Sequence, residues 1–193
     1  MTSLTDDGTL PSPHITAWLV PPKEANVIQL QSWLQQQHPS SPTFQLHLSL
    51  LAPLPPGGST VEQVRQISRE TAPFMVHPTG VSTGPEHFKN VLLQVEKTDA
   101  LDGLYCRLCK AFPDALSPTK TFDPHLSLLY GLHDEEERKR ASQEVMEWSG
   151  WKGSPWDGKS SFLADQLVLI DCGGTTEDWK LIETIPFGRP SDN

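Results

Sequence analysis

Apolar residues follow two different spacings along this chain, and the change from one to the other divides it into short elements. Alternation of apolar and polar residues indicates a half-buried strand, whereas apolar residues three and four positions apart indicate a helix. These patterns predict strands at 14–20, 45–52, 74–83, 91–96, 162–171 and 179–187. They predict helices at 26–37, 60–71, 101–112 and 134–148. The order of these elements favours a duplicated arrangement of strands and helices.

Local signals mark several ends of the helices. A proline follows His38, where the first helix is expected to end, because the residue before proline disfavours the helical conformation. Thr60 and Gln63 have the spacing of a capping box, so we expect the Thr60 side chain to cap a helix that begins there. The acidic start of the helix at 134–148 is followed by basic residues, and we expect this charged run to form a solvated face.

One pattern occurs twice. The segment Phe44–Leu51 reads FQLHLSLL, and Phe122–Leu129, 78 residues later, reads FDPHLSLL, with six of eight positions identical. Residues two apart on a strand share a face, so the imidazole and the hydroxyl of each copy point the same way. The four side chains are His47, Ser49, His125 and Ser127. Packing of equivalent strands explains the leucines of the repeat, but it does not require histidine and serine to recur together.

The repeated pair suits phosphoryl chemistry. Histidine has an ordinary pKa near 6.5, so His47 and His125 can accept and donate protons near neutral pH. In-line attack on a cyclic phosphate needs a base beside the incoming water and an acid beside the departing oxygen, on opposite sides of phosphorus. The hydroxyls of Ser49 and Ser127 can donate hydrogen bonds to the non-bridging oxygens. A nucleophilic serine is disfavoured, because neither a Ser-His-Asp order nor a nucleophile elbow is visible.

The two histidines are expected to face one another across a cleft. Each half of the chain contains a strand, a helix and then a strand with the His-x-Ser motif. Two similar lobes that meet across a concave sheet would bring His47 and His125 to opposite sides of one cavity. Neither motif has a carboxylate and histidine cluster with ligand spacing nearby, so we expect chemistry without a metal or another cofactor.

Length and charge fit a small enzyme with a small substrate. We expect 193 residues to form one bilobal domain at 14–193, preceded by a disordered polar tail at 1–13. The net charge of −9 and the pI of about 5.1 disfavour long nucleic acids, which bind chiefly through basic residues. A small phosphate ester can still bind in a local pocket. The chain has neither an apolar span nor a signal-peptide pattern, so we expect a cytoplasmic protein that does not enter a membrane. We also expect it to be a monomer.

The cysteines and tryptophans are more ambiguous. Cys106, Cys109 and Cys172 give an odd count, and the CxxC pair has no second pair to complete a zinc site. We expect buried free thiols, while a disulfide or a redox role stays open. A group of tryptophans could flank a base-stacking surface, although a place at the edge of the core is favoured. These tryptophans are Trp148, Trp151 and Trp156.

Other titratable residues have no repeated partner. Five histidines are expected to be surface or loop residues rather than catalysts: His14, His38, His77, His87 and His133. Lys89, Lys120 and Arg107 could neutralise a phosphate, and the sequence does not select one of them.

The two motifs with their flanking residues resemble a known family. The segments are AWLVPPK at Ala17–Lys23 and PHLSLLYG at Pro124–Gly131. They are similar to the two-histidine phosphoesterase superfamily and, within it, to the cyclic nucleotide phosphodiesterases of fungi and plants. The resemblance covers essentially the whole chain after the first dozen residues. It implies an α+β fold with pseudo-two-fold symmetry, in which two antiparallel sheets form a central cleft and the helices lie outside.

The resemblance also implies an activity. Such enzymes hydrolyse 2′,3′-cyclic nucleotides to 2′-phosphates, and ADP-ribose 1″,2″-cyclic phosphate, a product of tRNA splicing, to the 1″-phosphate. His47 and His125 would be the acid and base, and Ser49 and Ser127 would bind the phosphate. The family often has threonine in the first motif, so Ser49 is a departure that keeps the hydroxyl. Plant members have cysteine pairs that lock a loop, which the cysteines here need not match.

Tyr130 matches a family position that touches substrate. Strict alternation would place Tyr130 on the opposite face from His125, so the assignment requires the chain to turn or bulge near Gly131.

Two alternatives remain open from the sequence. The same superfamily contains enzymes that process RNA ends, as exonucleases or in a ligase-like manner, and the acidic charge argues against them. A non-catalytic nucleotide-binding module could also keep the fold. Two intact motifs argue against such a module.

Overall fold

The chain repeats one order of elements and then adds a final strand. The structure, a computed structural model, describes residues 9–115, 121–151 and 158–188. The first unit contains β1 (Ile15–Leu19), α1 (Asn26–Gln37), β2 (Leu48–Leu54), α2 (Gly58–Arg69), β3 (Phe74–Val76) and β4 (Pro78–Thr83). The second contains β5 (Val91–Val95), α3 (Asp99–Ala111), β6 (His125–Leu129), α4 (Glu135–Glu147), β7 (Phe162–Ala164) and β8 (Gln166–Asp171). The strand β9 (Lys180–Pro186) follows. The three short 3₁₀ helices are η1 (His87–Lys89), η2 (Pro113–Ala115) and η3 (Ser149–Trp151).

The strands pair with nearly two-fold symmetry. The main sheet has the order β4-β5-β6-β2-β1-β8-β9, and β3 pairs with β7 in a second, two-stranded sheet. If each strand of the first unit changes places with its counterpart in the second (β1 with β5, β2 with β6, β4 with β8), the order of the six strands from β4 to β8 is reversed and otherwise unchanged. All of the described pairs are antiparallel. The α+β fold with pseudo-two-fold symmetry is therefore confirmed, with one refinement: the two halves of the main sheet are joined between β6 and β2.

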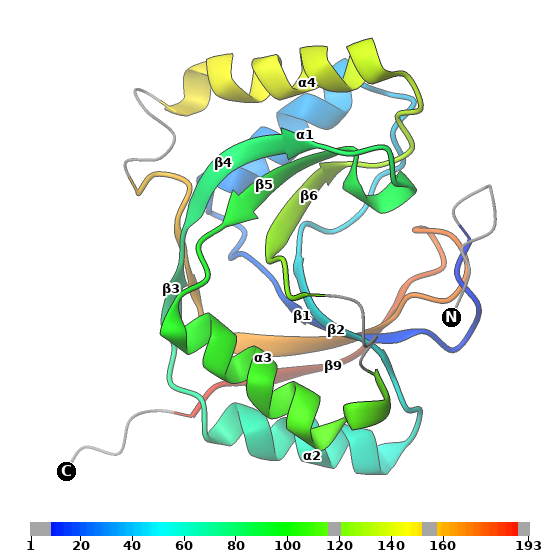
Figure 1. The fold of residues 1–193 in the computed structure, drawn as a ribbon, viewed down its shortest axis with the longest axis vertical. Coiled ribbons are helices and arrows are strands. Elements are labelled where there is room, and N and C mark those ends of the chain that lie inside the picture. Colours follow the sequence, from blue (N-terminus) through cyan, green and yellow to red (C-terminus); the bar gives the residue numbers. More distant parts are fainter. Residues whose placement is uncertain (1–8, 116–120, 152–157, 189–193) are drawn as a thin grey trace.

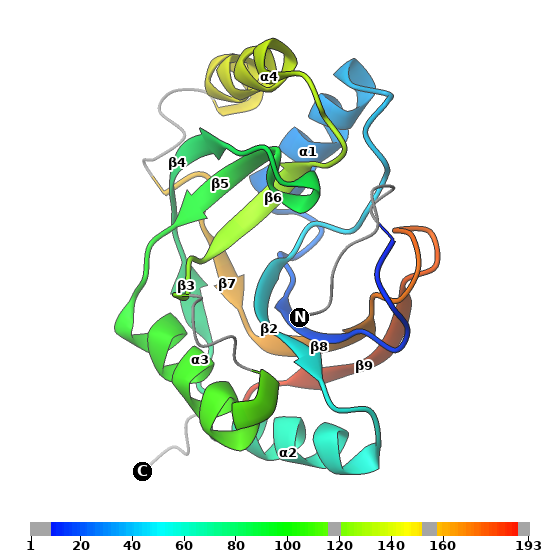
Figure 2. The ribbon, with the colours of Figure 1, turned by 45° about the vertical axis from the view of Figure 1, so that its right-hand side comes forward.

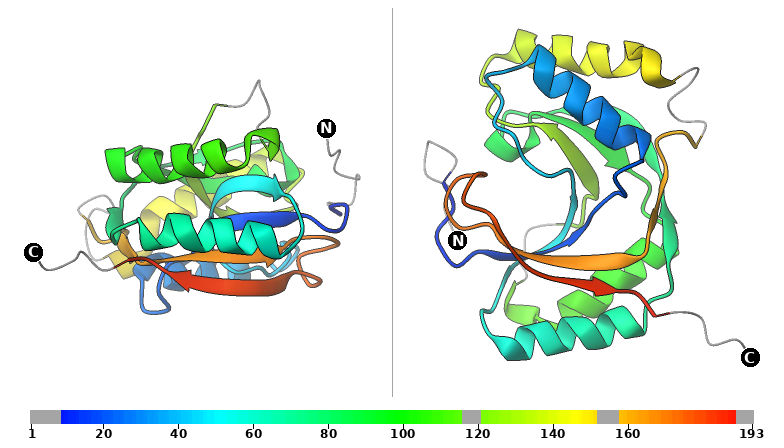
Figure 3. Two further views of the ribbon diagram at one scale, coloured as in Figure 1. Left: turned by 90° about the horizontal axis from the view of Figure 1, so that it is seen from below. Right: turned by 180° about the vertical axis from the view of Figure 1, so that it is seen from behind.

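Each half of the main sheet is the floor of one lobe. We call the lobe with β1, β2, β8 and β9 the His47 lobe, and the lobe with β4, β5 and β6 the His125 lobe. The helices lie outside, α2 and α3 on the His47 lobe and α1 and α4 on the His125 lobe (Figures 1 and 2). Thus α1, which precedes the first motif, packs against β6, whereas α3, which precedes the second motif, packs against β2 (Figure 3). Neither lobe is a continuous half of the sequence.

The helices follow the predicted spacing, although one predicted cap is wrong. Val27, Leu30 and Leu34 are buried on the inner face of α1, whose bounds match the prediction. The helix α2 begins at Gly58, and the Thr60 hydroxyl donates to the Pro55 carbonyl at 2.6 Å instead of capping the helix. Two prolines and two glycines before Thr60 allow the chain to turn earlier than a capping box would require.

His38 lies in the loop after α1, as expected of a surface or loop residue, but it is buried there. It follows α1 and is 4 % exposed. Its Nε2 lies 2.8 Å from Glu144, and its Nδ1 lies 3.6 Å from Glu137, both on α4. A histidine between two carboxylates therefore links the two helices of the His125 lobe.

The cysteines and tryptophans follow the predictions in part. All three cysteines are free, but Cys106 is exposed, Cys109 is half-buried and only Cys172 is buried. Trp151 is buried in the core, with Trp148 packed edge-on against it, and Trp156 lies outside the described residues. None of the helices within the described ranges is long and apolar enough to cross a membrane.

Candidate active site

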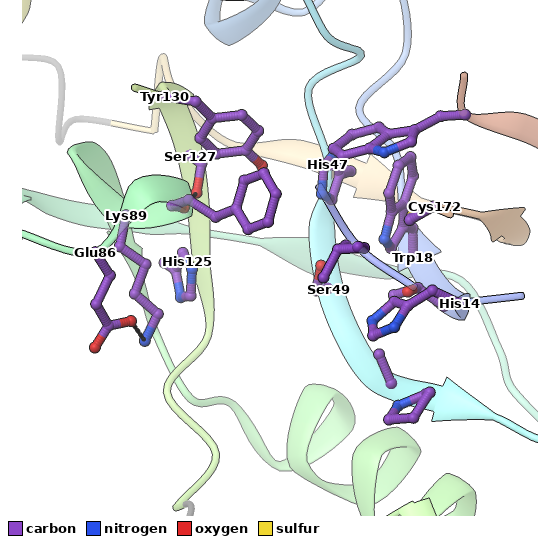
Figure 4. A pocket seen from close by; sticks show the side chains of 16 residues that line it. His14, Trp18, His47, Ser49, Glu86, Lys89, His125, Ser127, Tyr130 and Cys172 are labelled. Atoms are coloured by element: carbon purple, nitrogen blue, oxygen red, sulfur yellow. Dashed lines mark hydrogen bonds and ion pairs between the residues drawn. The ribbon is translucent and has the colours of Figure 1, made fainter. Parts of the chain in front are cut away.

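The two motifs meet at the joint between the lobes. The single residue pair that connects β2 with β6 in the described sheet is Leu48 with Leu126, the central residues of the two His-x-Ser motifs. In antiparallel register, the residues beside this pair face each other crosswise. His47 therefore faces the Ser127 position, and Ser49 faces His125, as Figure 4 shows across the cavity. The two histidines lie on a diagonal, one on each lobe.

A cavity of about 330 Å³ separates the two motifs. Both histidines, both serines and Tyr130 line it, so the structure brings together every residue that the sequence assigned to the site. The other lining residues come from both lobes and from loops around them. They are Leu10, His14, Thr16, Trp18, Ala52, Pro53, Glu86, Phe88, Lys89, Cys172 and Trp179. Leu10, within the segment expected to be disordered, forms a β-bridge with Gly174 and so is attached to the domain.

His47 is held in one orientation and is kept neutral. Its Nδ1 lies 2.6 Å from the Gln45 carbonyl, and because a carbonyl only accepts, Nδ1 is the donor. In the neutral ring, Nε2 is then the atom that can accept a proton. The imidazole also stacks on the Trp18 indole, with 3.5 Å between ring centroids. Burial lowers the pKa of His47 to about 4, although the Gln45 hydrogen bond opposes this shift and a charge on His125 would add to it.

His125 repeats this arrangement in a more open setting. Its Nδ1 donates to the Asp123 carbonyl at 2.7 Å, two residues earlier in the chain, as in the first motif. Partial burial lowers its pKa, with a smaller effect in the same direction from Lys89. The Asp123 carbonyl and nearby carboxylates oppose the shift. The two imidazoles thus share a tautomer, while His47 is the more deeply buried of the pair.

The two serines differ in their hydrogen bonds. The Ser127 hydroxyl donates to the Phe88 carbonyl at 2.8 Å and lies close enough to the Tyr130 hydroxyl to influence its pKa. Ser49 has no such partner among the described residues, and its side chain is exposed to the cavity. Ser49 is therefore free to donate to a ligand, whereas Ser127 must turn away from Phe88 to do so.

Tyr130 reaches the cavity because β6 bulges. Ser127 pairs with Leu92 and Leu129 pairs with Val91, so Leu128 is an extra residue on β6. A bulge shifts the alternation by one position, which places Tyr130 on the side of Ser127. Gly131 then turns the chain with a φ of +72°. The irregularity that the assignment of Tyr130 required is present. Burial raises the pKa of the Tyr130 hydroxyl above its usual range, so it remains a donor.

Sequence reasoning missed several lining residues, some of which leave a signal. His14, Thr16 and Trp18 are spaced two apart, just before and on the interior strand β1, and all three line the cavity. This spacing gives them one face, but β1 is buried on both sides, so no contrast of apolar and polar residues marked it. Trp179 lies in the loop before β9, and its indole is within 6.5 Å of the rings of Phe88 and Tyr130 on the other lobe. No local pattern indicated this position.

The basic candidates are now distinguished by position. Lys89 lines the cavity on the segment that includes η1, 3.8 Å from the Glu86 carboxylate. Arg107 lies on α3 and donates to the Thr71 hydroxyl at 2.9 Å, away from the cavity. Lys120 lies outside the described residues. Burial raises the pKa of the Cys172 thiol to about 12, so this cavity residue stays protonated. No cluster of three or more metal-ligating side chains occurs within the ranges that the structure describes.

Several solved structures, one of them of a phosphoesterase, share this fold. The structure is similar to LigT of Escherichia coli in complex with 3′-AMP, with a TM-score of 0.59, 11% identity and coverage of 91% of this chain and 98% of that chain. It is also similar to TT0787 of Thermus thermophilus, with a TM-score of 0.56, 14% identity and coverage of 91% of this chain and 98% of that chain. At these identities, the likeness shows the fold alone.

The sequence comparisons are more specific. A 2′,3′-cyclic-nucleotide 3′-phosphodiesterase of Yarrowia lipolytica is 25% identical to this chain in an alignment 215 residues long, gaps included. The alignment covers 88% of this chain and 98% of that protein. The family model described as cyclic phosphodiesterase-like protein matches residues 14–187. This match includes both motifs and nearly all of the described structure. The chain therefore belongs to the cyclic phosphodiesterase-like family, within the two-histidine phosphoesterase superfamily.

Proposed function

We propose that this protein hydrolyses small cyclic phosphodiesters by acid and base catalysis from its two histidines. The substrates would be 2′,3′-cyclic nucleotides, opened to 2′-phosphates, and ADP-ribose 1″,2″-cyclic phosphate, opened to the 1″-phosphate. The observation that carries the proposal is the crosswise arrangement of the two motifs about Leu48 and Leu126. It places one imidazole and one hydroxyl on each side of a single cavity.

The proposed reaction uses the two histidines in opposite protonation states. The neutral histidine takes a proton at Nε2 from a water molecule as the water oxygen bonds to phosphorus. The protonated histidine gives its Nε2 proton to the ribose oxygen as the P–O bond to that oxygen breaks. The product is a phosphate monoester with one free ribose hydroxyl. Because Nδ1 of both rings is fixed on a carbonyl, both Nε2 atoms are available for this exchange.

Negative charge develops on the non-bridging phosphate oxygens in the transition state, and hydrogen-bond donors stabilise it. We assign this role first to Ser49, because its hydroxyl has no other partner among the described residues. Ser127 would contribute after its hydroxyl turns from the Phe88 carbonyl, and the neighbouring Tyr130 hydroxyl would replace part of its hydrogen bonding.

The cavity fits a nucleotide-sized molecule better than a long chain. Its volume is at the lower end of the usual range of small-ligand sites. Aromatic side chains of Phe88 and Trp179 offer surfaces for a base.

The test is turnover on three substrates in the presence of excess EDTA. These are 2′,3′-cyclic AMP, ADP-ribose 1″,2″-cyclic phosphate and a short RNA with a 2′,3′-cyclic end. We expect a 2′-phosphate from the first and a 1″-phosphate from the second, with the RNA a poor substrate. Turnover of the RNA alone would instead support the RNA-end-processing alternative. Binding without turnover of any of the three would support the non-catalytic module.

A further inference from the structure

The cavity is aromatic at one end and charged at the other. On the His125 lobe, the labelled side chains follow the order Tyr130, Ser127, His125 and then the tips of Lys89 and Glu86 (Figure 4). On the His47 lobe, the corresponding series is Trp18, Ser49 and His14. Trp179 extends the aromatic end, since its ring lies 5.4 Å from that of Trp18 and 6.4 Å from that of Tyr130. The four motif side chains lie between the two ends.

A 2′,3′-cyclic nucleotide also has two different ends, one on each side of its cyclic phosphate. The base is attached to C1′, beside the carbon that holds the 2′-oxygen. The 5′-carbon is attached to C4′, beside the carbon that holds the 3′-oxygen. With the cyclic phosphate fixed between the histidines, the base and the 5′-substituent therefore extend from opposite ends of the ribose ring, both on its face away from the phosphate. A base at the aromatic end places the 5′-substituent at the charged end.

We propose that Lys89 and His14 form a second anion subsite, which binds a phosphate or pyrophosphate carried on the 5′-carbon of the cyclic substrate. This inference rests on the proposed function, because the cyclic phosphate fixes the direction of the ribose. ADP-ribose 1″,2″-cyclic phosphate, one of the two substrates proposed above, carries such a pyrophosphate. The inference assigns residues to that group and extends the substrates to 2′,3′-cyclic nucleotides that carry a 5′-phosphate.

The surroundings of Lys89 suit an exchangeable partner. Its ammonium lies 3.8 Å from Glu86, and the two side chains are 38% and 69% exposed. An exposed ion pair at this separation contributes little, so a phosphate dianion can replace the carboxylate as the partner of Lys89. Glu86 opposes an anion at the same place. Its carboxylate should therefore weaken the subsite without abolishing it.

His14 is positioned from its backbone. Its backbone N–H donates to Asp171 at 2.9 Å, and the same carboxylate oxygen accepts from the Gly173 N–H at 2.9 Å. This arrangement fixes the start of β1, with the His14 ring against the cavity. The His14 Nδ1 is buried and has no hydrogen-bond partner in the described structure. The Nε2 side of the ring can donate to a phosphate oxygen on the side of the cavity opposite Lys89.

The experiment compares kcat/KM for 2′,3′-cyclic AMP with that for the same compound bearing a 5′-phosphate. We expect the wild-type protein to prefer the 5′-phosphorylated compound. Lys89→Met should reduce the ratio of the two values by roughly tenfold, as for the loss of one charge-assisted hydrogen bond. His14→Gln should reduce the ratio by a smaller factor. Glu86→Gln should raise it by about threefold, because it removes only the opposing charge.

A matched lysine provides the control. Lys97→Met removes an exposed lysine that pairs with Asp102 at 3.2 Å outside the cavity, and it should leave the ratio unchanged. Equal losses on both compounds in Lys89→Met would overturn the inference and assign Lys89 to the scissile phosphate. A wild-type ratio at or below one would also overturn it. In both cases the wild-type protein would still hydrolyse plain 2′,3′-cyclic AMP, so the proposed function would stand.

Discussion

At the scale of single residues, the two motifs use the same device. In each, the imidazole Nδ1 donates to the carbonyl of the residue two positions earlier, Gln45 or Asp123. The backbone of the motif strand thus selects the tautomer, and no carboxylate is needed to orient the ring. A short sequence repeat therefore contains both the reactive group and its positioning partner.

The first prediction concerns the two histidines. His47→Ala and His125→Ala should each reduce kcat on 2′,3′-cyclic AMP by roughly 10²–10⁴-fold, the usual effect of removing a positioned acid or base. The double variant should lose much less than the product of the two effects, because both groups act on one transition state. His133→Gln, at an exposed position outside the cavity, is the matched control and should keep near-normal turnover. Near-normal activity in either alanine variant with the fold intact would mean that the repeat is structural.

The second prediction is the pH dependence of kcat/KM. Productive binding needs one neutral and one protonated histidine, so the profile should be bell-shaped. If both histidines kept their ordinary pKa near 6.5, the pH profile would be centred near neutral pH. Burial lowers both, that of His47 to about 4, and so the maximum should lie on the acid side of 6.5 in the free enzyme. The acid and alkaline limbs of the profile report pKa values of the coupled pair, so neither limb is assigned to one histidine. A rate that climbs steadily to pH 10 would contradict two-histidine catalysis.

At the scale of elements, the segment 84–90 before β5 is tied to the end of β6. The backbone N–H of Gly131 donates to the His87 carbonyl at 3.2 Å, and Ser127 donates to the Phe88 carbonyl. Asn90, 1% exposed, accepts from the Leu132 N–H at 2.8 Å. Its amide donates to the carbonyls of Gly84 and Glu86 at 3.2 and 3.1 Å. These bonds place Phe88 and Lys89 at the cavity.

The third prediction tests this connection. Asn90→Ala should lower the free energy of unfolding by about 1–3 kcal/mol, because it leaves buried backbone groups without partners. It should also raise KM more than it lowers kcat, since it displaces Lys89 and Phe88 and not the histidines. Urea unfolding and steady-state kinetics measure the two effects. Gln94→Ala, at an exposed position on β5, is the control and should change stability by less than about 0.5 kcal/mol. Unchanged stability in Asn90→Ala would contradict the assigned role.

The sequence predicted elements better than it predicted loops. Helices with a clear apolar face, such as α1, were located because the spacing that marks a helix is local. The same holds for the four motif side chains, since strand geometry fixes the face of His47 relative to Ser49. The places of Trp179, Lys89 and His14 depend on contacts with distant segments. The burial of His38 in its loop was not foreseen for the same reason, because its carboxylate partners lie about 100 residues later.

At the scale of the whole molecule, the exchanged helices bind the two lobes together. The helix α1 joins two strands of the His47 lobe yet packs on the His125 lobe, and α3 does the reverse. Most of the buried apolar residues of both lobes form one continuous core cluster. We therefore propose that residues 14–193 fold as one domain and not as two independent lobes.

The fourth prediction follows from this arrangement. Urea unfolding should give one transition, with the same midpoint for the far-ultraviolet circular dichroism signal and for tryptophan fluorescence. Leu34→Ala, in the His125 lobe, should lower the midpoint of both signals together by the loss of buried apolar contacts. Two separated transitions, with only one of them moved by the substitution, would show independent lobes.

The fifth prediction is a loss of stability in acid. The pKa of His47 falls from about 6.5 in the unfolded chain to about 4 in the folded one, so the unfolded chain binds this proton first. The contribution of this pKa difference to the free energy of unfolding is fully present above pH 6.5 and is lost as the pH falls towards 4. It amounts to roughly 3 kcal/mol. Urea unfolding between pH 7.5 and 4.5 should show a shallower slope for His47→Gln than for wild type. An equal slope in His47→Gln and in wild type would contradict the shift.

The pairing of Leu48 with Leu126 has a consequence for the direction of the reaction. A joint with local two-fold symmetry presents the same groups to a substrate from both sides, although a cyclic phosphate approached by water is not symmetric. The motifs alone thus cannot decide which histidine attends the water. Their unlike neighbours must break the symmetry: an indole stacked on His47, and a lysine with a glutamate beside His125. Exchanging these neighbours, with both motifs untouched, should exchange the acid and the base.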